Sequence, residues 1–510
     1  MGNEAGDEQE REHTMHRSSS HARRRWPVAV ASALAAIALS VPLAAHAAAV
    51  PDSAAVGPAA AALPALQVDG NRIVDANGED VALRGVSVLA PEQNDLCEYC
   101  NARPTSELID VAVDWNSRVI RLPVTEIGAT TDLAAYDAEY IAPYVAQAVE
   151  RGVYIIIDLH LVRNYGDAAG AVPRSTVERF WDYIAPIYGS NPNVVFEVFN
   201  EPISPASWNT WKDYIQPVVD GIRAAAPDTL LLMGSPQWST MLNGALTNPI
   251  VDDNTAYVYH LYPNQGAPTT ALLDQKFGTA AQTLPVVVSE FGWNPPGEFS
   301  DSITAGTTTN WGVPFRTYMD ARPWIGWQAW ILDNFWKPQM FDYDWNVLAG
   351  EHQGQFVKDW LAGAPNTSPC ADHDAIGASV QVSSQNSAST PGAKVVDGDC
   401  SDAGRWLSAV GDATPTATLT FAQPLDVASV GVYSGYGTST GTVLVDFSIQ
   451  AHTAAGWQTV QAVTGNTQGA REIAVGVAGV DQLRLVVTNP SASTTEAKIA
   501  RVHEIAVHIG

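Results

Sequence analysis

Short apolar runs alternate with longer amphipathic stretches through residues 81–332. Eight such runs, each bounded by polar or turn residues, cover 81–88, 118–124, 154–160, 194–201, 230–235, 256–262, 285–293 and 324–332. Some are almost continuously apolar, which is typical of strands buried on both faces of a parallel sheet. The stretches 137–151 and 175–188 between them have helical spacing. The pattern predicts a (β/α)8 barrel. A doubly wound open sheet is the alternative, disfavoured by the even spacing and by the lack of a Gly-rich phosphate turn.

The segments on either side of this region have different patterns. Residues 66–75 place turn residues between two short apolar stretches, which predicts a small hairpin that caps the barrel floor. We expect the barrel domain to span 65–362, followed by a linker at 363–374. Residues 375–510 alternate short β-prone runs, at 417–421, 443–447 and 482–487, with Ser, Thr and Gly turns. This pattern predicts an all-β sandwich.

The N-terminal segment resembles an export signal. Three consecutive arginines at 23–25 precede an apolar run at 28–43 and the small-residue site Ala45-His46-Ala47. We therefore expect a signal peptide at 1–47, a disordered Ala- and Pro-rich leader at 48–64, and a secreted, extracellular protein. A retained membrane anchor is the alternative for the apolar run. The arginine pair leaves export by the twin-arginine route open, and Met15 is an alternative start.

Composition narrows the class of ligand. The formal net charge is −27, which repels the phosphate backbone of nucleic acids and anionic membrane surfaces. We expect no nucleic acid partner, and no membrane partner after signal cleavage. Charged residues make up only 16% of the chain, and there are 16 tryptophans. That balance suits a neutral polar ligand, although a secreted protein with Trp in its core has the same composition.

Four cysteines are compatible with an exported protein. Cys97, Cys100, Cys370 and Cys400 allow three disulfide connectivities. The sequence favours pairing 97 with 100 and 370 with 400. A zinc or redox role for the Cys-x-x-Cys pair is the alternative, but the other two cysteines lie far along the chain and no histidine stands at ligand spacing.

Polar and aromatic residues close almost every predicted barrel strand. In a (β/α)8 barrel the active site lies at the C-terminal ends of the strands. The residues at these ends are Arg121, His160, Asn200, Glu201, His260, Tyr262, Glu290 and Trp330. Single histidines are often satisfied core residues, and Trp330 could simply plug the barrel mouth. Because all eight occupy strand ends, we interpret them together as one site.

Glu201 and Glu290 carry the chemical hypothesis. A carboxylate at a barrel mouth is costly unless it is used, and the alternative for each is a structural ion pair. Glycosidic bond cleavage needs one carboxyl group to protonate the leaving oxygen and a second to attack the anomeric carbon. Glu201, flanked by Asn200 and Pro202, suits the acid/base role. Glu290 is expected near Arg121 and Tyr262, which would keep it ionised as the nucleophile.

These motifs resemble family 5 of the glycoside hydrolases, the cellulase-like retaining enzymes. The similarity runs from about 66 to 361 and is most specific at 194–202, which ends in Asn200-Glu201-Pro202. Supporting motifs are Leu-Arg-Gly-Val at 83–86, Ile-Arg-Leu-Pro at 120–123, Asp-Leu-His at 158–160, His-Leu-Tyr at 260–262 and Ser-Glu-Phe-Gly at 289–292.

The resemblance implies a mechanism and a set of roles. Glu201 would be the acid/base and Glu290 the nucleophile of a double displacement with net retention and no catalytic cofactor. Arg121, His160, Asn200, His260, Tyr262 and Trp330 would be supporting and substrate-binding residues. Ser87 stands where many members have Asn, and 161–164 lacks the Pro-Gly common in cellulases. Both departures concern the substrate side, so they leave the sugar open.

The C-terminal segment resembles discoidin-like, coagulation factor 5/8 type C modules. The match rests on 395–399, 405–408 and 502–507. Such modules often bind a structural calcium, for which Asp397, Asp402 and Glu504 are the candidates. A metal-free sandwich with polar turns is the alternative. Tyr433, Tyr436 and Trp457 are candidates for sugar contact.

The sequence therefore predicts a secreted retaining glycoside hydrolase that cleaves β-linked glucan or mannan. An exo-acting β-glycosidase on short oligosaccharides and a noncatalytic carbohydrate-binding or adhesion protein are the alternatives. A Ser-based esterase is disfavoured because no Gly-x-Ser-x-Gly turn is present, and Ser289 should point away from the cleft if Glu290 points into it. The hypothesis requires the two glutamates to face one another across about 5 to 5.5 Å.

Overall fold

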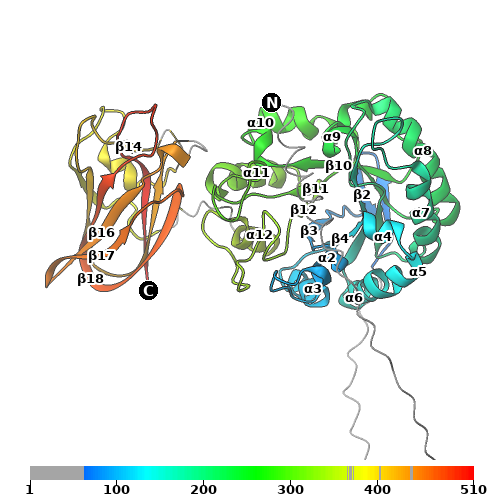
Figure 1. Cartoon of the computed structure of the whole chain (residues 1–510), viewed down its shortest axis with the longest axis horizontal. Helices are drawn as coiled ribbons and strands as arrows, with labels where there is room; N and C mark the ends of the chain where they lie inside the picture. Colours follow the sequence, from blue (N-terminus) through cyan, green and yellow to red (C-terminus); the bar gives the residue numbers. More distant parts are fainter. Residues whose placement is uncertain are drawn as a thin grey trace, which may run out of the picture. The chain divides into compact units, whose positions relative to one another are not determined.

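The computed structural model describes residues 63–364, 366, 370, 373–400, 402, 404–436 and 440–510. The predicted signal peptide and nearly all of the predicted leader lie outside these residues. Within them, no helix has the length and apolar character needed to cross a bilayer. The described residues form a closed barrel followed along the chain by an antiparallel β-domain (Figure 1).

Eight parallel strands close into a barrel in the order β10-β11-β12-β3-β4-β5-β7-β9. Their bounds are β3 Arg84–Ser87, β4 Val119–Thr125, β5 Tyr154–His160, β7 Val194–Glu197, β9 Leu231–Met233, β10 Thr255–Leu261, β11 Val286–Phe291 and β12 Gly326–Ala329. Every residue of β4, β7 and β11 is buried, as strands enclosed by helices on one side and barrel interior on the other must be. The (β/α)8 prediction is confirmed, with each strand inside or overlapping its predicted run.

Helices connect the barrel strands, and the longer ones cover the outside of the barrel (Figure 1). They are α2 Pro91–Leu96, α3 Thr105–Asp114, α4 Glu126–Thr130, α5 Leu133–Tyr136, α6 Ala142–Arg151, α7 Arg174–Tyr188, α8 Trp208–Ala225, α9 Pro236–Ser239, α10 Thr270–Leu273, α11 Val313–Asp320 and α12 Gln353–Leu361. Helix α6 ends at Gly152, whose φ of 67° is the left-handed conformation that glycine adopts without strain. The predicted helix at 137–151 begins with a π-helical turn, Asp137–Ile141.

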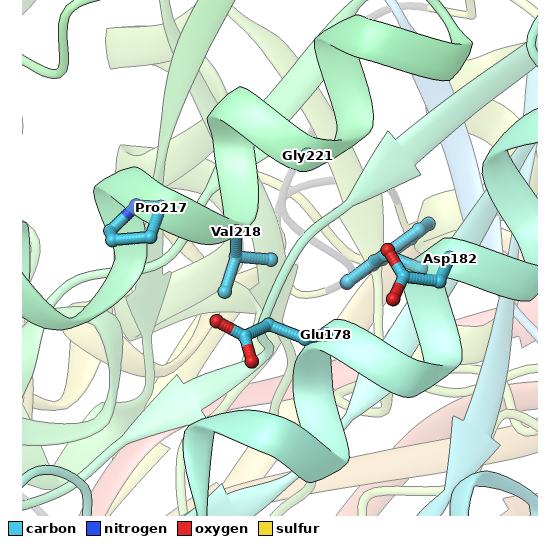
Figure 2. Close-up of a pocket in the computed structure, with 6 residues that line it drawn as sticks. Glu178, Asp182, Pro217, Val218 and Gly221 are labelled. Atoms are coloured by element: carbon cyan, nitrogen blue, oxygen red, sulfur yellow. The ribbon is translucent and has the colours of Figure 1, made fainter.

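Helices α7 and α8 pack against each other on this outer layer and leave a small pocket between them. Its lining residues are Glu178, Trp181, Asp182, Pro217, Val218 and Gly221 (Figure 2). None of the predicted site residues lines it. The pocket is therefore a gap between two packed helices and lies apart from the predicted site residues.

A hairpin closes the N-terminal end of the barrel. Strands β1 Leu66–Asp69 and β2 Arg72–Asp75 pair antiparallel. Leu66 and Ile73 share an apolar cluster with inward-facing residues such as Tyr154 and Val258. The predicted floor is thus confirmed, and it leaves the opposite end of the strands as the open face.

The C-terminal domain is an antiparallel all-β unit. Its seven-stranded sheet has the order β14-β19-β15-β18-β16-β17, with β13 paired to β15. The bounds are β13 Ser379–Val382, β14 Trp406–Leu407, β15 Thr416–Ser434, β16 Asp446–Thr453, β17 Gly456–Val463, β18 Ala470–Asn489 and β19 Arg501–Ile509. Residues from both halves of the long strands β15 and β18 share one apolar cluster. The discoidin-like likeness stays a prediction.

One strand boundary in this domain was predicted wrongly. The run 443–447 was expected to be a strand, but β16 begins only at Asp446, after a 3-10 turn at Thr440–Thr442. Val443 and Leu444 are buried in the connection, where the Asn466 amide donates to the Leu444 carbonyl. Burial within a loop produces the same apolar run as a strand does.

Both favoured disulfides are present. Cys97 is bonded to Cys100 and Cys370 to Cys400. The first closes a short loop beyond the C-terminal end of β3. The second joins two segments of the C-terminal domain.

Candidate active site

The C-terminal strand ends bring the eight predicted site residues to one end of the barrel. Arg121 comes from β4, His160 from β5, His260 from β10 and Glu290 from β11. Asn200 follows β7, Glu201 begins the short strand β8 (Glu201–Pro202), Tyr262 follows β10 and Trp330 follows β12. Strand β8 pairs with β6 (Val162–Arg163), which holds the backbone of Glu201 in place.

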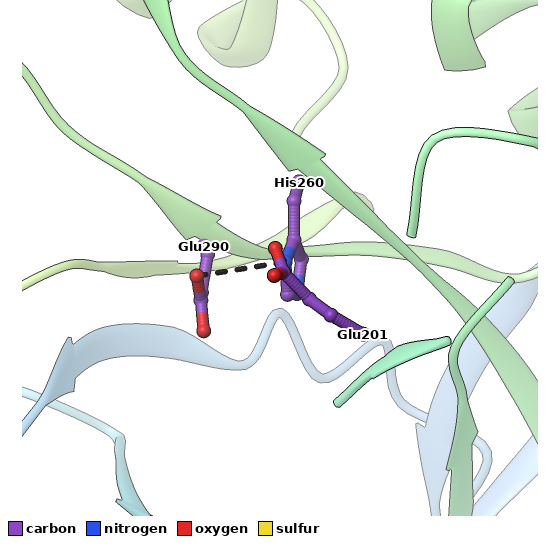
Figure 3. A group of neighbouring side chains, drawn as sticks. All are labelled: Glu201, His260 and Glu290. Carbon is purple, nitrogen blue, oxygen red and sulfur yellow. Dashed lines mark hydrogen bonds and ion pairs between the residues drawn. The ribbon is translucent and has the colours of Figure 1, made fainter. Parts of the chain in front are cut away.

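Glu201 and Glu290 face each other across His260 (Figure 3). One carboxylate oxygen of each glutamate and one ring nitrogen of His260 lie within 4.8 Å of one another. Nδ1 of His260 is 2.7 Å from Oε1 of Glu201 and 3.5 Å from Oε2 of Glu290. The exposed fractions are 9% for Glu201 and 5% for Glu290. Both carboxylates are therefore largely withdrawn from water but reachable from the barrel mouth.

The environment of Glu290 keeps it ionised. Nη1 of Arg121 donates to Oε1 at 2.7 Å and the Tyr262 hydroxyl donates to Oε2 at 3.1 Å. Burial by itself would raise the pKa of Glu290, but the charges of His260, Arg121 and His160 and the Tyr262 hydrogen bond lower it to about 2. A carboxylate in this state is prepared for nucleophilic attack.

Arg121 is the fully buried centre of this cluster. Its Nε and Nη2 donate to both oxygens of Glu197, at 2.7 and 3.0 Å. Nη2 also lies 3.0 Å from Oδ2 of Asp158 and donates to Oδ1 of Asn200 at 2.5 Å. Together with Glu290, three carboxylates contact the Arg121 guanidinium. These acceptors hold the guanidinium in one orientation.

Glu197 and Asp158 belong to this cluster but were not among the residues predicted from the sequence. Both are 0% exposed and each lies in an otherwise apolar barrel strand. Asp158 stands two residues before His160, so alternation along the strand places both side chains on the same face. An acidic residue inside an apolar run was the available signal.

The two histidines are held by carboxylates. Nδ1 of His160 lies 2.6 Å from Oδ2 of Asp158. Burial lowers the pKa of His160, but Asp158 and Glu290 outweigh it and the net shift is upward. Burial likewise lowers the pKa of His260, and Glu290 and Glu201 reverse this to a net rise. Both net shifts are upward because the neighbouring carboxylates stabilise a positive charge on the ring.

Trp330 lies beside this cluster with its ring stacked on His160, the ring centroids 5.4 Å apart and the planes 7° apart. The indole is partly exposed. A ring fixed on one face and open on the other suits stacking against the apolar face of a sugar. Of the other loop tryptophans, Trp293, Trp311 and Trp345 are buried packing residues, and Trp336 is partly exposed.

The orientation predicted for Ser289 is wrong. Its hydroxyl lies 3.1 Å from Nε2 of His260 and donates to Oε1 of Glu197 at 3.2 Å. The cause is a β-bulge in β11, because three residue steps from Val288 to Phe291 oppose two steps on β12. The extra residue lets Ser289 and Glu290 both face the barrel interior. Ser289 is 0% exposed, so it is not an attacking nucleophile.

Glu201, His260 and Glu290 are also the one group among the described residues whose ligand atoms are close enough to hold a metal ion. The Arg121 guanidinium and the Tyr262 hydroxyl occupy the two oxygens of Glu290. Oε1 of Glu201 is in hydrogen-bond contact with His260. A cation here would meet a fixed positive charge, so the donors fit proton chemistry better than metal binding.

The three calcium candidates do not form such a group in the described part of the C-terminal domain. Asp397 pairs with Lys394 at 2.9 Å, and Asp402 lies 3.3 Å from Nε2 of His503. Glu504 is buried and accepts from the Gly398 amide at 2.9 Å. Each of the three residues has its own protein partner in the structure, and the calcium assignment stays a prediction.

The sugar-contact candidates of that domain differ in exposure. Tyr433 is 7% exposed and therefore a packing residue. Tyr436 is 53% exposed and Trp457 38% exposed. Each of these two rings carries an arginine over its face, Arg405 and Arg484 respectively.

Comparison with known proteins gives a consistent result for the barrel. Residues 74–334 match the family described as cellulase, glycosyl hydrolase family 5. The chain is 32% identical over 228 residues to endoglucanase N of Pectobacterium atrosepticum, covering 44% of this chain and 49% of that protein. It is 28% identical over 312 residues to endoglucanase MaCel5A of a Microbulbifer species, covering 58% of this chain and 57% of that protein. The chain thus spans about half the length of these relatives.

A solved structure shares the fold. The native β-glucanase SdGluc5_26A of Saccharophagus degradans superposes with a TM-score of 0.54 at 24% sequence identity, covering 59% of this chain and 94% of that one. The same enzyme has been solved in complex with cellotetraose. At this identity the likeness establishes the barrel fold alone.

Proposed function

Because the chain belongs to glycosyl hydrolase family 5, we propose that it is a retaining hydrolase that cleaves the β-glycosidic bonds of a glucan polysaccharide. The relatives with the names endoglucanase N and endoglucanase MaCel5A favour glucan over mannan. The observation that carries the mechanism is the separation within 4.8 Å of a carboxylate oxygen of Glu201 from one of Glu290. Inverting enzymes need about 6.5–9.5 Å between carboxyl groups to admit a water, whereas direct attack needs about 5–5.5 Å.

In the first step Glu290 attacks the anomeric carbon and forms a covalent glycosyl ester. Its lowered pKa of about 2 keeps it ionised from mildly acidic to neutral pH. Glu201 transfers its proton to the glycosidic oxygen as the carbon–oxygen bond breaks. The leaving sugar chain then departs as a neutral alcohol.

In the second step Glu201 acts as the base. It takes a proton from a water molecule, whose oxygen attacks the anomeric carbon and displaces Glu290. Two inversions at the same carbon give net retention. Glu290 returns to its ion pair with Arg121, and Glu201 is again protonated.

The surrounding residues hold the reacting groups. Arg121 and Tyr262 fix the two oxygens of Glu290. Asn200 is held by Arg121, which leaves its amide free to reach a sugar hydroxyl beside the cleaved bond. One face of the Trp330 ring stacks on His160, and the opposite face is available to stack on a sugar. Such prior positioning lowers the reorganisation needed in the transition state.

We also propose that the protein is secreted and that its C-terminal domain attaches it to the polymer. The N-terminal export pattern and the exposed rings of Tyr436 and Trp457 support these two points.

The exo-acting alternative differs in product pattern. An endo-acting enzyme lowers the viscosity of a soluble glucan early, whereas an exo-acting enzyme releases small sugars first.

The stereochemistry of the product tests the mechanism. We expect proton NMR of a cellooligosaccharide digest to show the β-anomer first, with the α-anomer appearing only by mutarotation. Glu290→Gln and Glu201→Gln should each lower kcat by about 10³-fold or more, with the circular dichroism spectrum unchanged. Early α-anomer, or near wild-type turnover in either variant, contradicts the proposal.

A further inference from the structure

Ser289 occupies a position in the site that the double displacement does not use. It precedes Glu290 in β11, and the bulge in this strand turns both residues inward. Its hydroxyl contacts two groups, Oε1 of Glu197 at 3.2 Å and Nε2 of His260 at 3.1 Å. Ser289 therefore links Glu197, which binds Arg121, to His260, which binds Glu201.

The direction of these two hydrogen bonds follows from the number of protons available. Both oxygens of Glu197 accept from the Arg121 guanidinium. Burial raises the pKa of Glu197, but the two-pronged contact with a permanent cation fixes the carboxylate as an acceptor. The single Ser289 proton must then point at Glu197, and the Ser289 lone pair faces Nε2 of His260. Nε2 therefore carries a hydrogen.

When Nε2 of His260 carries a hydrogen, the protonation of Nδ1 and that of Glu201 are linked. The 2.7 Å contact between Nδ1 and Oε1 of Glu201 needs one shared proton. That proton is held either as the acid of Glu201 or on the imidazolium. It is the proton that the leaving oxygen receives.

We propose that Ser289 is a positioning residue: by donating to Glu197 and accepting from Nε2, it fixes the tautomer of His260 that keeps the catalytic proton between Nδ1 and Glu201. The kinetic part of this inference rests on the proposed function, in which Glu201 is the acid/base. The tautomer itself does not.

Removing the hydroxyl has a defined effect on the proton. Without Ser289 as acceptor, neutral His260 is free to carry its hydrogen on Nδ1 and donate it to ionised Glu201. The pair then releases its proton more easily. The charged groups that face the pair are Glu290, Glu197 and Arg121, with Tyr262 beside them. Of these groups, Glu197 loses the hydrogen bond that Ser289 donates, whereas the contacts of Glu290 with Arg121 and Tyr262 stay in place.

The first measurement is the pH profile of kcat/KM on carboxymethyl cellulose with full-length protein. In Ser289→Ala we expect the alkaline limb to move lower by about one pH unit, since one hydrogen bond to a charged group is lost. The acid limb should stay in place. Ser289→Thr, which keeps the hydroxyl, should restore the alkaline limb. Ser117→Ala, a buried serine that precedes β4 at the opposite end of the barrel, is the matched control.

The second measurement does not need activity. Nitrogen-15 NMR of histidine-labelled protein, with the His260 signal identified by its loss in His260→Gln, should show Nε2 protonated in wild type. It should show a mixed tautomer in Ser289→Ala. An unprotonated Nε2 in wild type, or an unmoved alkaline limb in Ser289→Ala, overturns the inference. A wild-type protein without glucanase activity counts against the proposed function alone, and NMR still decides the tautomer.

Discussion

At the scale of single residues, the site is a cluster of buried charges centred on Arg121. The guanidinium contacts Glu197, Asp158 and Glu290, and all of these side chains are 6% exposed or less. Buried carboxylates without a cation would neutralise themselves by taking up protons. Arg121 therefore makes it possible for Glu290 to remain a carboxylate in a dry site.

The ionisation of Glu290 gives a prediction about pH. Because its pKa is lowered from 4.5 to about 2, Glu290 stays ionised as pH falls through 4 and loses its charge only near pH 2. The stability that its ion pair contributes is present above pH 4.5 and is lost toward pH 2. We expect kcat/KM to show no acid limb at the ordinary glutamate value, with circular dichroism at each pH as the control for folding. An acid limb near 4.5 in folded protein contradicts the assignment.

The structural role of Glu197 is tested by removing its charge. Glu197→Gln leaves part of the Arg121 guanidinium unpaired in a fully buried position, which costs about 3–5 kcal/mol. The matched control is Glu126→Gln, whose pair with Arg163 is 38% and 41% exposed and should contribute about 1 kcal/mol at most. Urea denaturation measures both. Equal, small losses would show that the buried pair does not stabilise the barrel.

At the scale of elements, one extra residue in β11 shapes the site. The bulge between Val288 and Phe291 places both Ser289 and Glu290 on the inner face of a strand that would otherwise alternate.

The loops beyond β3 and β12 form a second feature at the same end. There the Tyr343 hydroxyl donates to the Tyr99 carbonyl, and the Asn334 amide donates to the Cys100 carbonyl.

These two loops present exposed aromatic rings beside the mouth. Tyr99 is 72% exposed and Tyr343 50% exposed, and the Cys97–Cys100 disulfide closes the loop that carries Tyr99. Rigid rings of this kind bind extended sugar chains at low entropic cost. We expect Tyr343→Ala to raise KM on long glucan several-fold and to leave hydrolysis of a short aryl cellobioside unchanged. Val251→Ala, an exposed apolar residue before β10 and hence at the other end, is the control.

At the scale of the whole molecule, two apolar cores divide the described chain. The barrel clusters contain no residue beyond 361, and the clusters of the β-domain begin at Cys370. Each part buries its own core, which is the usual sign of separately folding domains. We expect deletion of 375–510 to spare hydrolysis of soluble glucan and to weaken pull-down by insoluble cellulose. Undiminished pull-down would reject an attachment role for this domain.

The sequence by itself determined the barrel and most of the site. Apolar runs report burial directly, so all eight strands were predictable, and in a barrel the strand ends converge whatever the loops do. That geometry made Glu201, Glu290 and their six supporting residues identifiable together. Both disulfide pairings favoured from the sequence are present in the structure.

Tertiary structure alone decided which side chains touch. A bulge depends on the register of two neighbouring strands, so no local pattern revealed that Ser289 faces inward. The pairing of Arg121 with Glu197 joins residues 76 positions apart, and the burial of Trp293 depends on packing partners from other segments. The spacing of apolar residues along the sequence indicates which residues are buried. Which side chain pairs with a buried polar group depends on the closed barrel, because the barrel brings distant strands together.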